Sequence, residues 1–85
     1  MKTKDELITL LVENVKEFNS YIEENIDNGI DLTEVDLSNI TVADAVFHNV
    51  DLSSTTFSDA HLTNVKFENC DLSSADFTRS NLEEC

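Results

Sequence analysis

A large apolar residue recurs at every fifth position over the last two thirds of the chain. Eleven consecutive steps carry leucine, valine or phenylalanine: Leu32, Leu37, Val42, Phe47, Leu52, Phe57, Leu62, Phe67, Leu72, Phe77 and Leu82. Two residues before each step lies a second series of small or medium side chains, most of them apolar, which runs from Ile30 to Ser80. A period of five fits neither an α-helix nor a flat strand. The repeat therefore predicts a chain that turns a corner every five residues and buries both series.

The turns must come from the repeat itself, because the chain has one glycine and no proline. One step reads Ala75-Asp76-Phe77-Thr78-Arg79. This pattern resembles the pentapeptide-repeat family, whose repeat is roughly Ala, then Asp or Asn, then Leu or Phe, then two polar residues. The resemblance covers Ile30 to Cys85 and implies an all-β solenoid, a right-handed quadrilateral β-helix of just under three coils with twenty residues in each. Residues twenty apart are then expected to stack, which gives two internal ladders: Leu32, Leu52 and Leu72, and Leu37, Phe57 and Phe77.

The opening segment follows a helical period instead. Over residues 3–28, apolar side chains recur at steps of three and four, the spacing of one helical face: Leu7, Leu11, Val15, Phe18, Ile22 and Ile26. Thr3 followed by Glu6 fits a capping box, and Asn28-Gly29 is a plausible stop. The pattern predicts one helix, or two with a break near Asn19-Ser20.

Two structural units follow from these periods: an N-terminal capping helix over residues 1–29 and the β-helix over residues 30–85. A solenoid needs its ends covered, because an open coil exposes apolar ladders and unpaired strand edges. The helix is the expected cover for the first coil.

No corresponding cover follows the last coil, since the repeat runs to the end of the sequence. The side chains expected at a possible end-to-end interface are Phe67, Leu72, Phe77, Leu82 and Cys85. Either two chains join there, or the sequence is a piece of a longer solenoid. A homo-oligomer through this end, or through the N-terminal helix, is the expected assembly.

Charge narrows the possible partners. Five lysines and arginines stand against 18 aspartates and glutamates, which gives a net charge of −13. Such a chain repels nucleic-acid phosphate and anionic membranes, so direct nucleic-acid binding and membrane binding are not expected. No apolar run approaches the ~20 residues of a membrane span. A soluble cytoplasmic protein is the expectation.

Asp31, Asp51 and Asp71 fall twenty residues apart, so the coil length predicts one outward column of carboxylates about 4.8 Å from each other. One interpretation is an acidic stripe that attracts a cation or a basic protein surface. The other is that aspartate simply suits this repeat position.

Enzyme chemistry has little support. The two histidines, His48 and His61, sit at positions expected to face solvent, and no nucleophile is paired with a base by any motif. Cys70 is predicted to be a buried structural thiol, and Cys85 lies on another corner, so no internal disulfide is expected. No catalytic, metal-binding or cofactor-binding residue is predicted.

Two functions are compatible with these features. The first is a non-enzymatic structural or protein-interaction module, oligomeric, whose acidic surface meets a protein partner that the sequence does not identify. The second follows the quinolone-resistance members of the family, which look like DNA in charge and shape and bind DNA gyrase. The short solenoid disfavours the second function, unless several copies stack into one rod.

Overall fold

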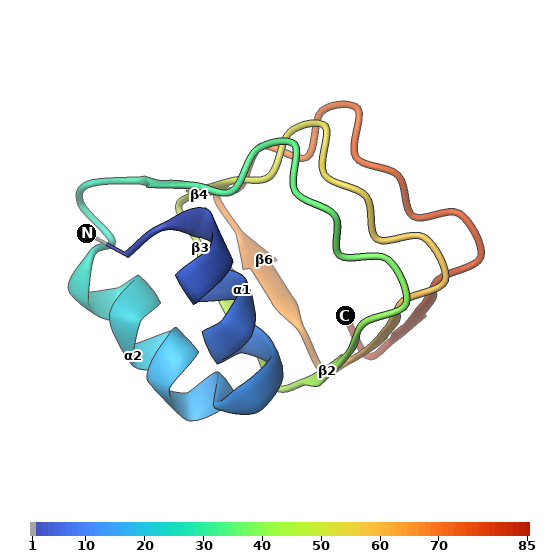
Figure 1. Ribbon diagram of the computed structural model, residues 1–85, viewed down its shortest axis with the longest axis horizontal. Coiled ribbons are helices and arrows are strands. Elements are labelled where there is room, and N and C mark those ends of the chain that lie inside the picture. The colour runs from blue at the N-terminus through green and yellow to red at the C-terminus, as the bar shows by residue number, and fades with distance from the viewer. Residues whose placement is uncertain (1) are drawn as a thin grey trace.

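The computed structural model describes residues 2–85, which begin with two helices, α1 (Lys4–Glu13) and α2 (Val15–Glu24). They lie side by side at the end where the coils begin (Figure 1). The capping box is confirmed: the Thr3 hydroxyl accepts from the Glu6 N–H at 3.2 Å, and the Glu6 carboxylate accepts from the Thr3 N–H at 2.8 Å. Of residues 2–85, no helix is long and apolar enough to cross a membrane.

The break between the helices lies at Asn14, so the predicted break near Asn19-Ser20 is wrong. Asn14 leaves the helical conformation, with φ −150° and ψ 81°. Its own N–H still donates to the Leu10 carbonyl, while its side chain accepts from the Glu17 N–H at 3.2 Å. One asparagine therefore ends the first helix and begins the second.

The predicted stop at Asn28-Gly29 is also wrong, because α2 ends at Glu24. Asn25 terminates the helix: its side-chain amide donates to the Tyr21 carbonyl at 2.9 Å, which satisfies a carbonyl of the last turn. Gly29 has a positive φ of 69° and leads the chain into the first strand.

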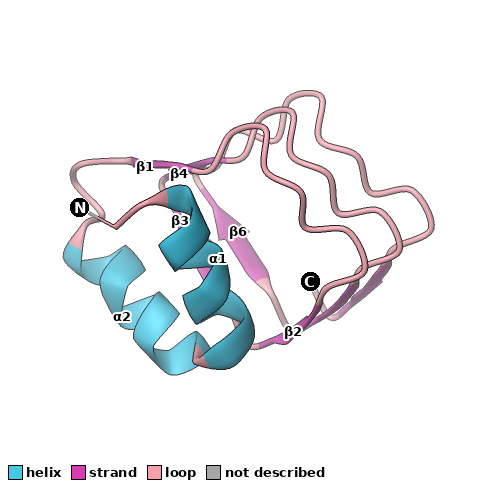
Figure 2. Ribbon diagram, viewed as in Figure 1, coloured by secondary structure: helices cyan, strands magenta, loops and turns pink. Residues whose placement is uncertain are grey.

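Seven short strands follow, all paired in parallel (Figure 2). They are β1 (Ile30–Asp31), β2 (Thr41–Ala43), β3 (Val46–His48), β4 (Val50–Asp51), β5 (His61–Thr63), β6 (Lys66–Glu68) and β7 (Asn81–Glu83). They form three sheets, in the orders β1-β4, β2-β5-β7 and β3-β6. Paired residues lie twenty apart, as in Ile30 opposite Val50 and His61 opposite Asn81. The predicted twenty-residue register of parallel strands is thus confirmed.

The turns between strands use a left-handed residue at every fifth position. The series starts at Gly29 and continues through eleven other residues: Glu34, Asn39, Asp44, Asn49, Ser54, Asp59, Asn64, Asn69, Ser74, Arg79 and Glu84. Six of the eleven are asparagine or aspartate, the side chains that tolerate this conformation best after glycine. This regular use of left-handed residues explains how the chain turns with one glycine and no proline.

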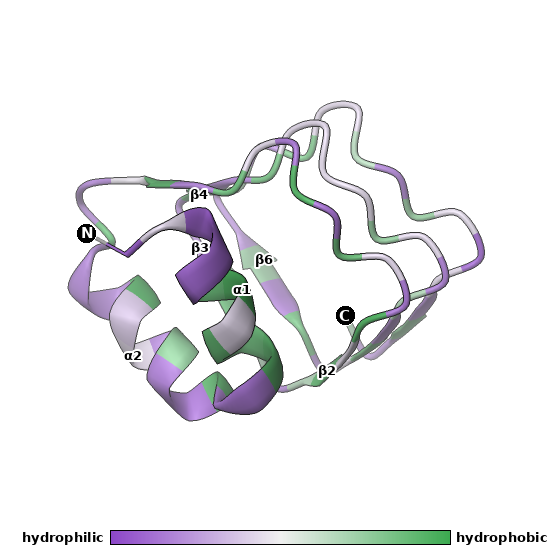
Figure 3. Cartoon of the chain, in the orientation of Figure 1, coloured by the Kyte–Doolittle hydropathy of each residue, from purple (hydrophilic) through white to green (hydrophobic). Residues whose placement is uncertain are grey.

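Both five-residue series point inward, and apolar and polar stretches alternate along each coil (Figure 3). One continuous core runs from Leu7 in α1 to Val65 in the second coil. Phe18 of α2 packs edge-on against Phe47 of β3, with the ring centroids 5.4 Å apart. Since the helices and the coils share this core, the division into residues 1–29 and 30–85 stays a prediction.

Burial decreases toward the last coil. Leu52 in the second coil is fully buried, whereas Leu72, stacked after it, is half-buried. Val15 of α2 and Ile26, which follows α2, are also only half-buried, unlike the rest of the predicted apolar face. The two helices cover the first coil, and no described residue covers the third.

Candidate functional site

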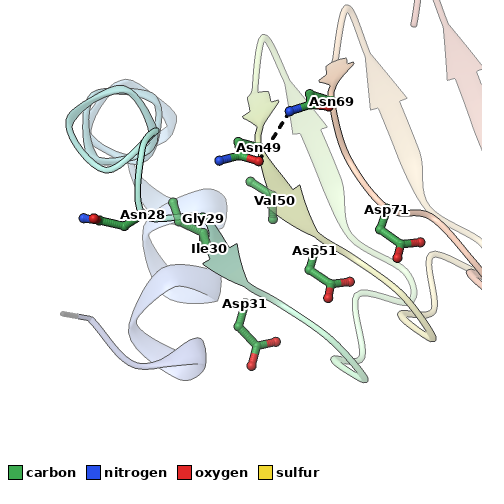
Figure 4. A pocket seen from close by; sticks show the side chains of 9 residues that line it. All are labelled: Asn28, Gly29, Ile30, Asp31, Asn49, Val50, Asp51, Asn69 and Asp71. Carbon is green, nitrogen blue, oxygen red and sulfur yellow. Dashed lines mark hydrogen bonds between the residues drawn. The ribbon is translucent and has the colours of Figure 1, made fainter.

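The aspartate column lies on one face of the coils. Asp31 of β1 stands opposite Asp51 of β4, and Asp51 pairs with Asp71 through an isolated parallel bridge. All three are exposed, and their carboxylates form a row across three successive coils (Figure 4). The structure therefore brings together the three residues that the sequence placed in one column.

Each carboxylate of the column also holds the turn that follows it. One oxygen, Oδ1, accepts both the backbone N–H and the side-chain hydroxyl of the residue two positions on. The N–H bonds measure 2.9 Å from Thr33 to Asp31, 3.0 Å from Ser53 to Asp51 and 2.9 Å from Ser73 to Asp71. The hydroxyl bonds measure 2.7, 2.8 and 2.5 Å in the same order.

At Asp31 and Asp71 these bonds favour the ionised form of the carboxyl group. The Thr33 N–H and hydroxyl lower the pKa of Asp31, and the Ser73 hydroxyl and N–H lower the pKa of Asp71. Within the described part of the chain, the second oxygen, Oδ2, has no hydrogen-bond partner in any of the three aspartates. Aspartate thus suits the repeat position and still leaves one charged acceptor facing solvent.

A shallow groove of about 360 Å³ runs beside the column, and three asparagines line it: Asn28, Asn49 and Asn69. The Asn49 amide donates to the Ile26 carbonyl at 2.6 Å, which ties the first coil to the segment after α2. The Asn69 amide reaches the Asn49 side chain at 3.4 Å, as Figure 4 shows. Sequence reasoning missed both residues, although their twenty-residue spacing and repeat position carried the same signal as the aspartates.

One lysine approaches the column at its first member. The Lys4 ammonium lies 3.8 Å from the Asp31 carboxylate and donates to the Thr33 carbonyl at 2.7 Å. Asp51 and Asp71 have no ion-pair partner among residues 2–85. A row of carboxylates with outward oxygens can accept the N–H groups of lysine or arginine side chains.

The proposed end-to-end interface lies on the last coil. Phe67, Leu72 and Phe77 are half-buried and pack against the core. Leu82 is 44% exposed, an unusual value for a large apolar residue of the repeat, and Cys85 is exposed. The structure gathers these five side chains at one end of the stack.

The remaining candidates do not form a reactive cluster. His61 is exposed on β5, but His48 is half-buried, because it lies against α2 with its ring nitrogen 3.8 Å from the Glu23 carboxylate. Cys70 is half-buried rather than buried, since no coil of the described chain stacks on it; partial burial raises the pKa of its thiol. In the described chain, no three histidine, cysteine or acidic side chains gather as metal ligands would.

Comparison with known proteins identifies the family to which the repeat belongs. A family model described as the pentapeptide repeat region matches residues 28–85. Searches of curated proteins and of solved structures returned no match. The matched residues make up more than half of the chain and include every strand, and the resemblance inferred from the five-residue period is confirmed. The chain therefore belongs to the pentapeptide-repeat family.

Proposed function

We propose that this chain is a non-enzymatic protein-interaction module of the cytoplasm, which presents the column of Asp31, Asp51 and Asp71 to a basic surface of a protein partner. The observation that carries the proposal is the free outward oxygen on each of the three carboxylates. We also infer that the parallel strands belong to a right-handed quadrilateral β-helix, the form that the family implies.

The local hydrogen bonds support recognition because they fix the carboxylates before any partner arrives. Oδ1 of each aspartate is held by two donors in its own turn, so the orientation of Oδ2 is set by the backbone. A preorganised acceptor loses little side-chain freedom on binding. The net charge of −13 adds long-range attraction for a cationic partner.

The test is a triple variant, Asp31→Asn with Asp51→Asn and Asp71→Asn. Asparagine keeps the side-chain oxygen that accepts in the turn and removes the charge. The matched control carries Glu24→Gln, Asp27→Asn and Asp76→Asn, which change the net charge equally on other parts of the surface. In a pull-down experiment, the immobilised wild type and the control should both retain a binding protein that the column variant does not retain. Calorimetry with that purified protein should give similar affinities for the wild type and the control and a weaker affinity for the column variant. Equal retention by both triple variants would refute the proposal.

The assembly is proposed to form through the open last coil. Leu82 is 44% exposed there, so Leu82→Asp should convert an oligomer to a monomer without loss of the fold. Light scattering coupled to size exclusion, with and without reductant, measures this and separates apolar association from a disulfide through Cys85. A wild-type monomer would contradict the proposed assembly.

The second candidate is imitation of DNA, and charge density favours it. The molecule is 31 Å long in its greatest dimension and carries a net charge of −13. A DNA duplex of that length carries roughly 18 negative charges. A supercoiling assay with DNA gyrase distinguishes the candidates: inhibition that the column variant loses would favour mimicry, and no effect from a stable oligomer would favour the interaction module.

A further inference from the structure

A second groove, of about 390 Å³, lies between α1 and the first coil. Its apolar lining comes from two places: Ile8 and Val12 of α1, and Leu37 and Ile40 of the coil. Val12 is 56% exposed, the most exposed large apolar side chain among residues 2–85. The groove contains none of the residues of the acidic column, so it is a separate surface.

The coil presents an unpaired backbone edge in this groove. Thr56 of the second coil donates its N–H to the Val35 carbonyl at 3.0 Å and accepts from the Leu37 N–H at 2.8 Å. Asp36 lies between those two residues, and its backbone N–H and C=O point away from the second coil, as the alternation of a parallel ladder requires. Neither group has a hydrogen-bond partner in residues 2–85. This edge can accept one more strand.

Charge limits what can occupy the groove. Of the eight residues that line the groove, Asp36 alone carries a charge, and no lysine or arginine of residues 2–85 lines it. The Asp36 carboxylate is exposed, with Oδ1 held by the Ser38 N–H and hydroxyl and Oδ2 without a partner in that part of the chain. A cationic occupant complements both this carboxylate and the net charge of −13.

We infer that the groove docks an extended segment of a protein partner in which basic and apolar side chains alternate. The segment adds a strand along the backbone of Asp36, packs an apolar side chain against Ile8 and Val12, and directs a basic side chain to the Asp36 carboxylate. This docking goes beyond binding at the acidic column, and it stands whether or not the column binds a partner.

The probe is a fluorescent peptide of sequence Lys-Val-Lys-Ile-Lys-Val-Lys, measured by fluorescence anisotropy on the full chain. We expect saturable binding with one peptide per chain. Val12→Lys should weaken it by more than about tenfold, because the change removes apolar contact and adds a like charge. Ser20→Lys is the control: it adds the same charge at an exposed position of α2 and should change the affinity less than about twofold.

A second pair of variants isolates the carboxylate. Asp36→Asn keeps the acceptor for Ser38 and removes the charge, and Asp27→Asn removes the same charge from an exposed carboxylate that belongs to neither the groove nor the acidic column. The first should weaken peptide binding about fivefold and the second less than about twofold. Equal effects would show that the peptide responds only to net charge, which would overturn the inference.

The backbone edge is tested with the same peptide N-methylated at alternate amides, which cannot pair as a strand. Loss of binding is expected, and undiminished binding would overturn strand addition. Circular dichroism verifies that each variant folds. If Val12→Lys does not fold, Val12→Ala takes its place, with Ser20→Ala as the control. Absence of saturable binding to the wild type refutes the inference. The inference is also refuted if light scattering shows a wild-type dimer that Val12→Lys converts to a monomer, because a second copy of the chain would then cover the groove.

Discussion

The rings of Phe57 and Phe77 stack with their centroids 4.9 Å apart and their planes 3° from parallel. Phe47 and Phe67 stack in the same way at 5.2 Å, and the two stacks meet edge to face, as in Phe57 against Phe67 at 6.1 Å. Parallel planes at this separation arise because successive coils are displaced along the stack with little rotation. Aromatic contacts of this kind each contribute about 0.5–1.5 kcal/mol beyond burial, so the ladder ties the three coils together.

Replacing Phe57 with alanine should therefore be strongly destabilising. The side chain is fully buried and contacts three other rings. We expect Phe57→Ala to lower the free energy of unfolding by about 3–5 kcal/mol, measured by urea denaturation followed by circular dichroism. Phe77→Ala is the control. Phe77 is half-buried in the last coil, so its replacement should lower the free energy of unfolding clearly less. Equal losses would mean that the last coil is as well packed as the second.

Asn19 attaches α2 to the first coil at the corner between β2 and β3. Its amide donates to the Asp44 carbonyl at 2.9 Å, and its side-chain oxygen accepts from the Val46 N–H at 2.8 Å. Asn19→Ala removes both bonds, so we expect a loss of about 1–2 kcal/mol despite the better helix propensity of alanine. Ser20→Ala, at an exposed neighbouring position, measures the propensity effect alone. An Asn19→Ala variant as stable as Ser20→Ala in urea denaturation would contradict the prediction.

Asn19 also shows where sequence reasoning failed. Asn14 and Asn19 are equally plausible helix breaks in the sequence, and the structure uses Asn14. Asn19 stays helical because its side chain finds partners at Asp44 and Val46, far along the chain. A local pattern contains no information about such a contact. The groove beside Val12 was missed for the same reason, since it depends on how α1 lies against the first coil.

The repeat was predictable because its signal is one-dimensional. A five-residue period identifies both buried series, and a twenty-residue coil then places Asp31 beside Asp51 and Phe57 beside Phe77 without any tertiary information. The extent of burial was not predictable from the period. Cys70 occupies the same kind of position as the fully buried Ala45, yet it is half-buried because no coil within residues 2–85 stacks on it.

Thr55 is the one polar residue in the buried core of the described chain, and its hydroxyl donates to the Leu32 carbonyl of the preceding coil at 2.7 Å. Cys70 directs its thiol to the Phe47 carbonyl with the same spacing along the chain. Thr55→Val keeps the shape and leaves the Leu32 carbonyl without this donor, so we expect a loss of about 1–3 kcal/mol. The measurement is urea denaturation, and a variant at least as stable as the wild type would show that the hydrogen bond makes no net contribution to the free energy of unfolding.

Glu34 is a glutamate in the left-handed conformation, with φ 58°. Glu34→Asn should raise the free energy of unfolding by about 0.5–1 kcal/mol, because asparagine tolerates this conformation better. Removing a negative charge from an acidic chain also stabilises it. Glu34→Gln is therefore the control, because it removes the same charge but glutamine does not tolerate the left-handed conformation as asparagine does. The difference between the two variants in thermal denaturation measures the backbone effect, and no difference would contradict it.

The turn aspartates predict a loss of stability in acid. The Ser38 hydroxyl and N–H lower the pKa of Asp36 below its ordinary value of 3.8, so between the two values the unfolded chain binds more protons than the folded one. The contribution of Asp36 is therefore present above pH 3.8 and lost as the pH falls through the lower folded value.

Asp36→Asn isolates this contribution, with Asp27→Asn as the control. Asp27 is exposed and its carboxylate has no hydrogen-bond or ion-pair partner in residues 2–85, so its replacement changes the net charge without disturbing a turn. Near neutral pH, Asp36→Asn should melt at a lower temperature than Asp27→Asn. Well below pH 3.8 the two variants should converge, because the wild-type carboxylate is then protonated in both states. A gap that persists in acid would assign the effect of Asp36 to the shape of the turn rather than to its charge.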